Sequence, residues 1–143
     1  MIIVKLLMRW LHIFSVITAA GITVFLRLAL LPALAAVADE ARKAVIQSLS
    51  RRLRVLIRAA IGGAMLSGVY NTILLSKTAV PPYGFVYAVK MAMSGAVFVV
   101  LIIFTSSKPR YADFQANWRK WLGLNLALAI IIVALSAWLR YLH

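Results

Sequence analysis

Residues 10–34 read WLHIFSVITAAGITVFLRLALLPAL, an almost unbroken apolar stretch that contains one histidine, His12, and one arginine, Arg27. A helix needs roughly 20 predominantly apolar residues to cross the hydrocarbon core of a bilayer. Lipid offers no partners to free backbone N–H and C=O groups, so a single span must be helical. The stretch therefore predicts a transmembrane helix. It decides the fold class because three later stretches have the same character.

The composition of the whole chain also indicates that it lies in a lipid bilayer. Of its 143 residues, 64% are hydrophobic and only 13% are charged, and the mean hydropathy is +0.97. Soluble domains usually contain about 45–50% apolar and about 25% charged residues. A water-soluble chain of this length cannot bury so much apolar surface. The chain has no cysteine, which excludes disulfides and thiolate metal sites.

We expect four transmembrane helices, at residues 10–34, 55–75, 83–104 and 121–142. Helix breakers stand near the ends of these stretches. Pro32 closes the first, Pro81 and Pro82 divide the second from the third, and Pro109 follows the third. The expected fold class is all-α: one integral membrane four-helix bundle that forms a single domain over residues 1–143.

The lysines and arginines predict the orientation of these helices. The loops after the first and third spans, with the start of the fourth, contain Arg42, Lys43, Arg51, Arg52, Arg54, Lys108, Arg110, Arg119 and Lys120. The opposite face has fewer basic residues, namely Lys5, Arg9, Lys77 and Arg140. Because basic loops stay preferentially in the cytoplasm, we expect both termini on the outer side.

The net charge of +13 also bears on the partners of the chain. Basic residues beside a span commonly set its topology and contact anionic headgroups, at about 1 kcal/mol for each residue near the surface. Neither basic loop contains an element of interleaved aromatic and basic residues that would recognise nucleic acid. We therefore expect membrane lipids as partners and no nucleic acid.

Polar residues inside the spans are the candidate functional residues, because ionisable groups there are costly unless paired or hydrated. His12 and Lys90 are expected at similar depth, since the first and third helices run in the same direction. Asn71 and Arg9 complete an expected polar layer in the outer half of the membrane. His12 has two interpretations: a cofactor ligand, or a residue that forms a hydrogen bond between helices. Lys90 could instead extend outward to the headgroups.

Two stripes of small residues accompany this layer: Ala59, Gly63 and Ser67 in the second span, and Ser15, Ala19 and Thr23 in the first. Small residues at intervals of four let two helices approach closely in lipid. Such a face below a histidine could also make room for a flat cofactor. Close packing alone would explain both stripes.

The stretches WLHIFSVITAAGITVFLRLALLPAL, RRLRVLIRAAIGGAMLSGVYNTILL and PPYGFVYAVKMAMSGAVF resemble the copper-resistance D (CopD) family of small bacterial membrane domains. The shared features are a Trp-x-His opening, an Arg and Leu-Leu-Pro close, a basic turn, and Pro-Tyr-Gly followed by a lysine. The pairing of histidine and lysine is also similar to HemJ-type four-helix membrane proteins. The resemblance implies a multi-pass protein of the bacterial inner membrane, with the outer side facing the periplasm.

The resemblance implies haem b as the cofactor, with His12 as the metal ligand and Lys90 at the second matching position. Arg9 or Lys90 would then meet the propionates. His12 is the only histidine within the expected spans. A bis-histidine site within one chain is therefore excluded. Copper is the less favoured metal. Met91 and Met93 diverge by about 200° on a helix and cannot share one ion.

Three functions therefore stay open. The first is a haem protein for electron transfer or for redox chemistry of porphyrin or copper. The second is a non-catalytic accessory subunit that contacts other subunits of a membrane complex or further copies of itself. The third, a transport component, ranks last because the helix breakers stand at span ends. The acids Asp39, Glu40 and Asp113 all fall in loops, so redox chemistry would need a bound cofactor. Whether the chain is an enzyme stays undecided.

Overall fold

The computed structural model describes residues 2–75 and 81–141, and every regular element in these ranges is helical. The elements in chain order are α1 (Ile2–Val24), the π-helix η1 (Phe25–Leu30), α2 (Leu31–Leu34), α3 (Asp39–Leu75), α4 (Pro81–Phe104), the 3-10 helix η2 (Pro109–Tyr111), α5 (Ala112–Ala116) and α6 (Trp118–Tyr141). The prediction of an all-α fold is confirmed for the described residues.

Within these ranges, four helices are long and apolar enough to cross a membrane, as predicted. All four begin before the predicted spans, and two of them do so by eight residues or more. The first begins at Ile2 rather than at residue 10, and the second begins at Asp39 rather than at residue 55. Asp39 and Glu40 stand in the first turn of α3, where negative charge is favourable to the helix dipole. Leu142, predicted to end the fourth span, lies outside the described residues.

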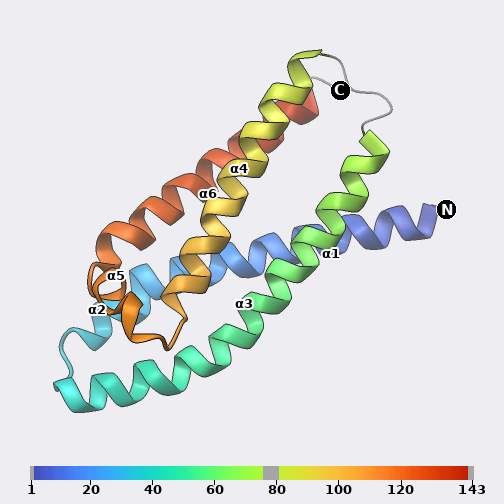
Figure 1. The fold of residues 1–143 in the computed structure, drawn as a ribbon. Coiled ribbons are helices and arrows are strands. Elements are labelled where there is room, and N and C mark those ends of the chain that lie inside the picture. The colour runs from blue at the N-terminus through green and yellow to red at the C-terminus, as the bar shows by residue number, and fades with distance from the viewer. Residues whose placement is uncertain (1, 76–80, 142–143) are drawn as a thin grey trace.

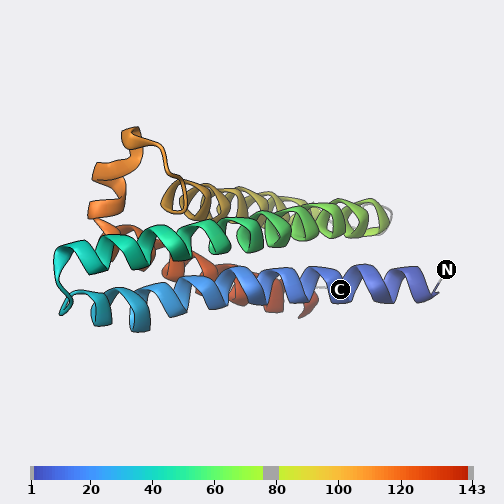
Figure 2. The ribbon, with the colours of Figure 1, turned by 90° about the horizontal axis from the view of Figure 1, so that it is seen from below.

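The four long helices form two layers. Figure 2 shows α3 beside α4 in one layer and α1 beside α6 in the other. Across the layers, α1 packs along α3 and α4 packs along α6. The start of α1 and the last turn of α6 lie at one end of the bundle (Figure 1). The turn before α3 and the α5 segment lie at the other end, called here the basic end because the two basic loops meet there.

The core of the bundle is a narrow apolar zone between the layers. Its buried side chains include Ile22, Leu26, Ile57, Leu101 and Leu122. Most other large apolar side chains face outward, as expected of helices that meet lipid. The first turns of α1 are strongly exposed, with Ile2 at 83% and Ile3 at 72% exposure.

Pro32 does not interrupt the helical backbone. A proline inside an α-helix lacks an N–H and collides with the carbonyl four residues before it. Here the wider π-helical turns of η1 come immediately before α2, which contains Pro32, and the helix continues to Leu34. A π-helical segment changes the hydrogen-bonding register and so makes room for the ring. Pro32 was predicted to close the span, and the helix does end two residues later.

Candidate functional site

His12 contacts the neighbouring helix through a serine. Its Nδ1 lies 3.1 Å from Oγ of Ser67 on α3. The side chain of Ser67 is fully buried. The Ser67 hydroxyl donates within its own helix, at 2.5 Å from the Gly63 carbonyl. Because a serine has one hydroxyl proton, Ser67 then accepts a hydrogen bond from His12. This assigns the proton to Nδ1 and leaves the lone pair of the imidazole on Nε2.

The small residues below His12 bring α1 and α3 into direct contact. A Cβ added at Gly63 would collide with the Ser15 hydroxyl and lie 3.2 Å from the Leu11 side chain. Ser15, Ala19 and Thr23 are all buried, so the predicted stripe on the first span is confirmed. The seam is closed here, and it leaves no room for a flat cofactor between α1 and α3.

The predicted stripe on the second span is only partly right. Gly63 and Ser67 face α1, but Ala59 is exposed, whereas Ala60 and Ala64 are buried. The physical reason is the pitch of the helix. Intervals of four overshoot a repeat of 3.6 residues, so a stripe drawn at strict intervals drifts off the contact face.

Lys90 of α4 is half-buried and close enough to His12 for their charges to interact. The two residues singled out by the sequence therefore lie within electrostatic range of each other. Asn71 lies one turn after Ser67 on α3 and is half-buried, whereas Arg9 lies one turn before His12 and is exposed. Within residues 2–75 and 81–141, no recorded hydrogen bond joins Asn71 or Arg9 to His12. The expected polar layer included Asn71 and Arg9. From here on, the name polar layer refers to His12, Ser67 and Lys90 alone.

The polar layer fits a metal that brings its own macrocycle better than a bare ion. Among the described residues, no group of three or more His, Cys, Asp or Glu side chains could hold a metal ion. A haem iron needs only one axial ligand from the chain, and the lone pair on His12 Nε2 can serve. Lys90 supplies a cation beside it for an anionic substituent.

Sequence reasoning missed a second set of polar contacts, at the basic end. Arg54 of α3 donates from Nε to the Thr105 carbonyl at 3.0 Å, and its guanidinium also bonds to the Ser107 hydroxyl. The Gln115 amide lies within hydrogen-bonding distance of three carbonyls, those of Ile103 at 3.2 Å, Phe104 at 3.0 Å and Ser106 at 2.7 Å. The last turn of a helix leaves carbonyls unpaired, so Arg54 and Gln115 cap α4.

Two further polar residues lie between α1 or η1 and α6. The Arg27 guanidinium donates to the Arg119 carbonyl and packs over Gly123, where an added Cβ would lie 2.7 Å from Nη1. Asn125 is buried and donates from Nδ2 to Thr23 Oγ1 at 3.0 Å, while its Oδ1 has no hydrogen-bond partner among the described residues. Asn125 is the one amide in residues 121–142, which could have marked it.

The candidate site is therefore a histidine with an assigned tautomer, held by a neighbouring helix and faced by a lysine. It offers one imidazole nitrogen, Nε2, and one nearby lysine amine, both within the membrane-spanning helices. Comparison of the chain with protein-family models, with curated proteins and with solved structures gives no match. Function is inferred below from the residues and their geometry.

Proposed function

We propose that the chain is a CopD-like membrane protein that binds haem b through His12 and serves electron transfer or redox chemistry of porphyrin or copper. The observation that carries the proposal is the hydrogen bond between His12 Nδ1 and Ser67. Metal-ligating histidines usually donate their second ring nitrogen to a fixed acceptor, which sets the tautomer and the orientation of the ring. Ser67 fulfils that role and leaves Nε2 as the ligand atom.

The closed seam between α1 and α3 supports a cofactor on the side of His12 away from α3, within electrostatic range of Lys90. Lys90 would pair with a propionate, and Arg9 and Asn71 are the next polar groups along α1 and α3. When bound, haem b supplies a one-electron couple, tuned by its axial ligand and by its burial. Ser67 orients His12 and the packed small residues keep water from its α3 side.

A reduced-minus-oxidised spectrum of the purified protein tests this proposal. We expect a b-type band in the wild type, no band in His12→Ala, and a shifted or weakened band in Ser67→Ala. Ser94→Ala is the matched control, because Ser94 donates only to the Lys90 carbonyl of its own helix, at 2.9 Å. The control should leave the band unchanged. A wild-type protein that stays spectrally flat when expressed with added haem precursor contradicts the proposal.

We further propose that the protein lies in the bacterial inner membrane with the basic end in the cytoplasm and both termini in the periplasm. The asymmetry of lysine and arginine supports this orientation. The cysteine-free chain allows a direct test with single cysteines at exposed positions. A membrane-impermeant maleimide should label Ile3→Cys in spheroplasts, and it should label Ser48→Cys only after lysis. The reverse pattern contradicts the orientation.

A second candidate is a non-catalytic accessory subunit, which contacts other subunits of a membrane complex or further copies of this chain. The same bond between His12 and Ser67 favours it, because an interhelical hydrogen bond is by itself sufficient reason for a buried histidine. Under this alternative, His12→Ala and Ser67→Ala lower the thermal stability by similar amounts and no protein in the series shows a haem band.

A further inference from the structure

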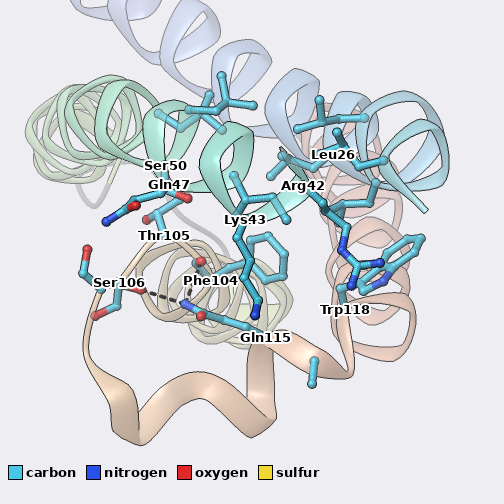
Figure 3. Close-up of a pocket in the computed structure, with 18 of the residues that line it drawn as sticks. Leu26, Arg42, Lys43, Gln47, Ser50, Phe104, Thr105, Ser106, Gln115 and Trp118 are labelled. Atoms are coloured by element: carbon cyan, nitrogen blue, oxygen red, sulfur yellow. Dashed lines mark hydrogen bonds between the residues drawn. The ribbon is translucent and has the colours of Figure 1, made fainter. Parts of the chain in front are cut away.

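The basic end contains a cavity of about 820 Å³ that no residue of the polar layer touches. It is bounded by η1 and α2, by the first turns of α3, and by the segment from the end of α4 to the start of α6 (Figure 3). Pockets for small molecules commonly measure about 300–1,000 Å³. The cavity therefore has room for a ligand of considerable size.

One part of the cavity is apolar and reaches into the bundle. Leu26 and Leu30 of η1 line it from one side, and Phe104 at the end of α4 lines it from another. Leu26 also belongs to the buried core of the bundle. The apolar part therefore lies at the level of the hydrocarbon region, which suits an alkyl chain.

The opposite part carries positive charge. Figure 3 shows Lys43 extending from α3 toward Gln115 of α5, and Arg42 extending toward Trp118 at the start of α6. No aspartate or glutamate is found among the described residues that line the cavity. Arg42 forms an ion pair with Asp39, whose side chain is 74% exposed, and such surface pairs are weak. The charge of this rim is therefore open to an anion.

The other polar groups of the lining are largely committed to the backbone. The Gln115 amide caps α4, and the Thr105 hydroxyl donates to the Leu101 carbonyl at 2.8 Å. Arg42 and Lys43 are the cations of the described lining, so they are the groups best suited to hold an anion there. The helix α3 is also too long to lie wholly within the hydrocarbon layer. With 37 residues, α3 is about 55 Å long at about 1.5 Å per residue, against a core of about 30 Å.

We propose that this cavity binds one anionic glycerophospholipid from the adjoining leaflet. The phosphate lies between Arg42 and Lys43, and one acyl chain lies along Leu26 and Leu30. Charge complementarity argues for an anionic rather than a zwitterionic lipid, since the lining supplies two cations and the only recorded counter-charge among the described residues is the exposed Asp39 beside Arg42. Basic pockets on the cytoplasmic side of helical membrane proteins commonly bind such headgroups. The proposal is independent of haem, because it concerns the other end of the bundle.

Native mass spectrometry of the full chain in detergent tests the proposal, with phosphatidylglycerol and phosphatidylcholine of equal chain length as the probes. We expect one phosphatidylglycerol to stay bound at least tenfold more tightly than phosphatidylcholine. The double variant Arg42→Gln/Lys43→Gln should lose at least about tenfold in affinity, given the usual contribution of a basic residue. Arg51→Gln/Arg52→Gln is the matched control, because it removes the same charge from exposed positions of the same helix outside the cavity.

Equal loss in the two double variants overturns the proposal, since it would show general attraction to a basic surface. Ser50→Trp tests the cavity separately, because it puts bulk into the lining and keeps both cations. It should reduce binding of phosphatidylglycerol while circular dichroism shows unchanged helicity; unchanged binding contradicts occupation of the cavity. Glycerol phosphate at millimolar concentration should not displace the lipid. Displacement would identify a soluble phosphate ester, not a lipid, as the ligand.

Discussion

The two ends of the bundle use polar side chains differently. In the polar layer, side chains bond to side chains of other helices, as His12 does with Ser67. At the basic end, Arg54 and Gln115 bond mainly to backbone carbonyls that the end of α4 leaves open. The second arrangement fulfils a requirement of any helix that ends inside a fold. The first fulfils no such requirement, which makes the polar layer the better place to look for chemistry.

The largest effect is expected where the closed seam below His12 is forced open. Gly63→Leu would put a side chain into Ser15 and Leu11, and overpacking of this kind typically costs about 1–3 kcal/mol. Gly62→Leu is the control, since a Cβ there meets none of the described atoms within 4 Å. Unfolding by sodium dodecyl sulfate should separate the two variants. Similar stability of both would show that α1 and α3 are not in contact at this point.

The next effect concerns the cap of α4. Gln115→Leu removes the donor shared by three carbonyls, and an unsatisfied, partly buried acceptor costs about 1–2 kcal/mol. Gln47→Leu is the matched control, because Gln47 also lines the cavity but is exposed and caps no helix. Thermal unfolding in detergent should show a lower midpoint for Gln115→Leu and an unchanged midpoint for Gln47→Leu. An unchanged midpoint would mean that water replaces the amide without loss.

A smaller effect is expected in the polar layer. Ser67→Ala removes the acceptor of His12 Nδ1, and interhelical hydrogen bonds in membranes contribute about 0.6 kcal/mol on average. Ser94→Ala serves again as the control, with no expected loss of stability. If Ser67→Ala destabilised the protein as much as Gln115→Leu does, the polar layer would have to be regarded as structural, like the basic end.

The smallest effect is expected at Asn125. Its Oδ1 is unpartnered among the described residues, and Thr23 keeps its own bond to the Ala19 carbonyl at 3.1 Å. Asn125→Leu, which has the same number and branching of side-chain heavy atoms, should therefore change the free energy of unfolding by no more than about 0.5 kcal/mol. Asn125→Ala leaves a void and should cost more. A large loss in Asn125→Leu would show that Oδ1 has a partner in the working protein.

The helices were predictable because lipid imposes one simple rule on apolar stretches. Their starts were not, since hydropathy marks the apolar part of a helix and says nothing of polar turns such as those after Asp39. The proximity of His12 and Lys90 followed from equal depth in two parallel spans. The capping of α4 could not be predicted from the sequence. The role of Gln115 depends on where α5 meets α4, and no local sequence pattern encodes that contact. The bond of Arg27 was not predictable for the same reason: its partner, the Arg119 carbonyl, lies on another helix.

The unequal lengths of the helices have a consequence for the surrounding membrane. The continuous helix from Ile2 to Leu34 has 33 residues, against 24 in α6. At about 1.5 Å per residue this is a difference of roughly 13 Å, and the surplus on α1 is strongly apolar. A hydrophobic length that exceeds the bilayer is accommodated by helix tilt or by local thickening. Bilayer thickness should therefore influence how far the first helix leans away from α6.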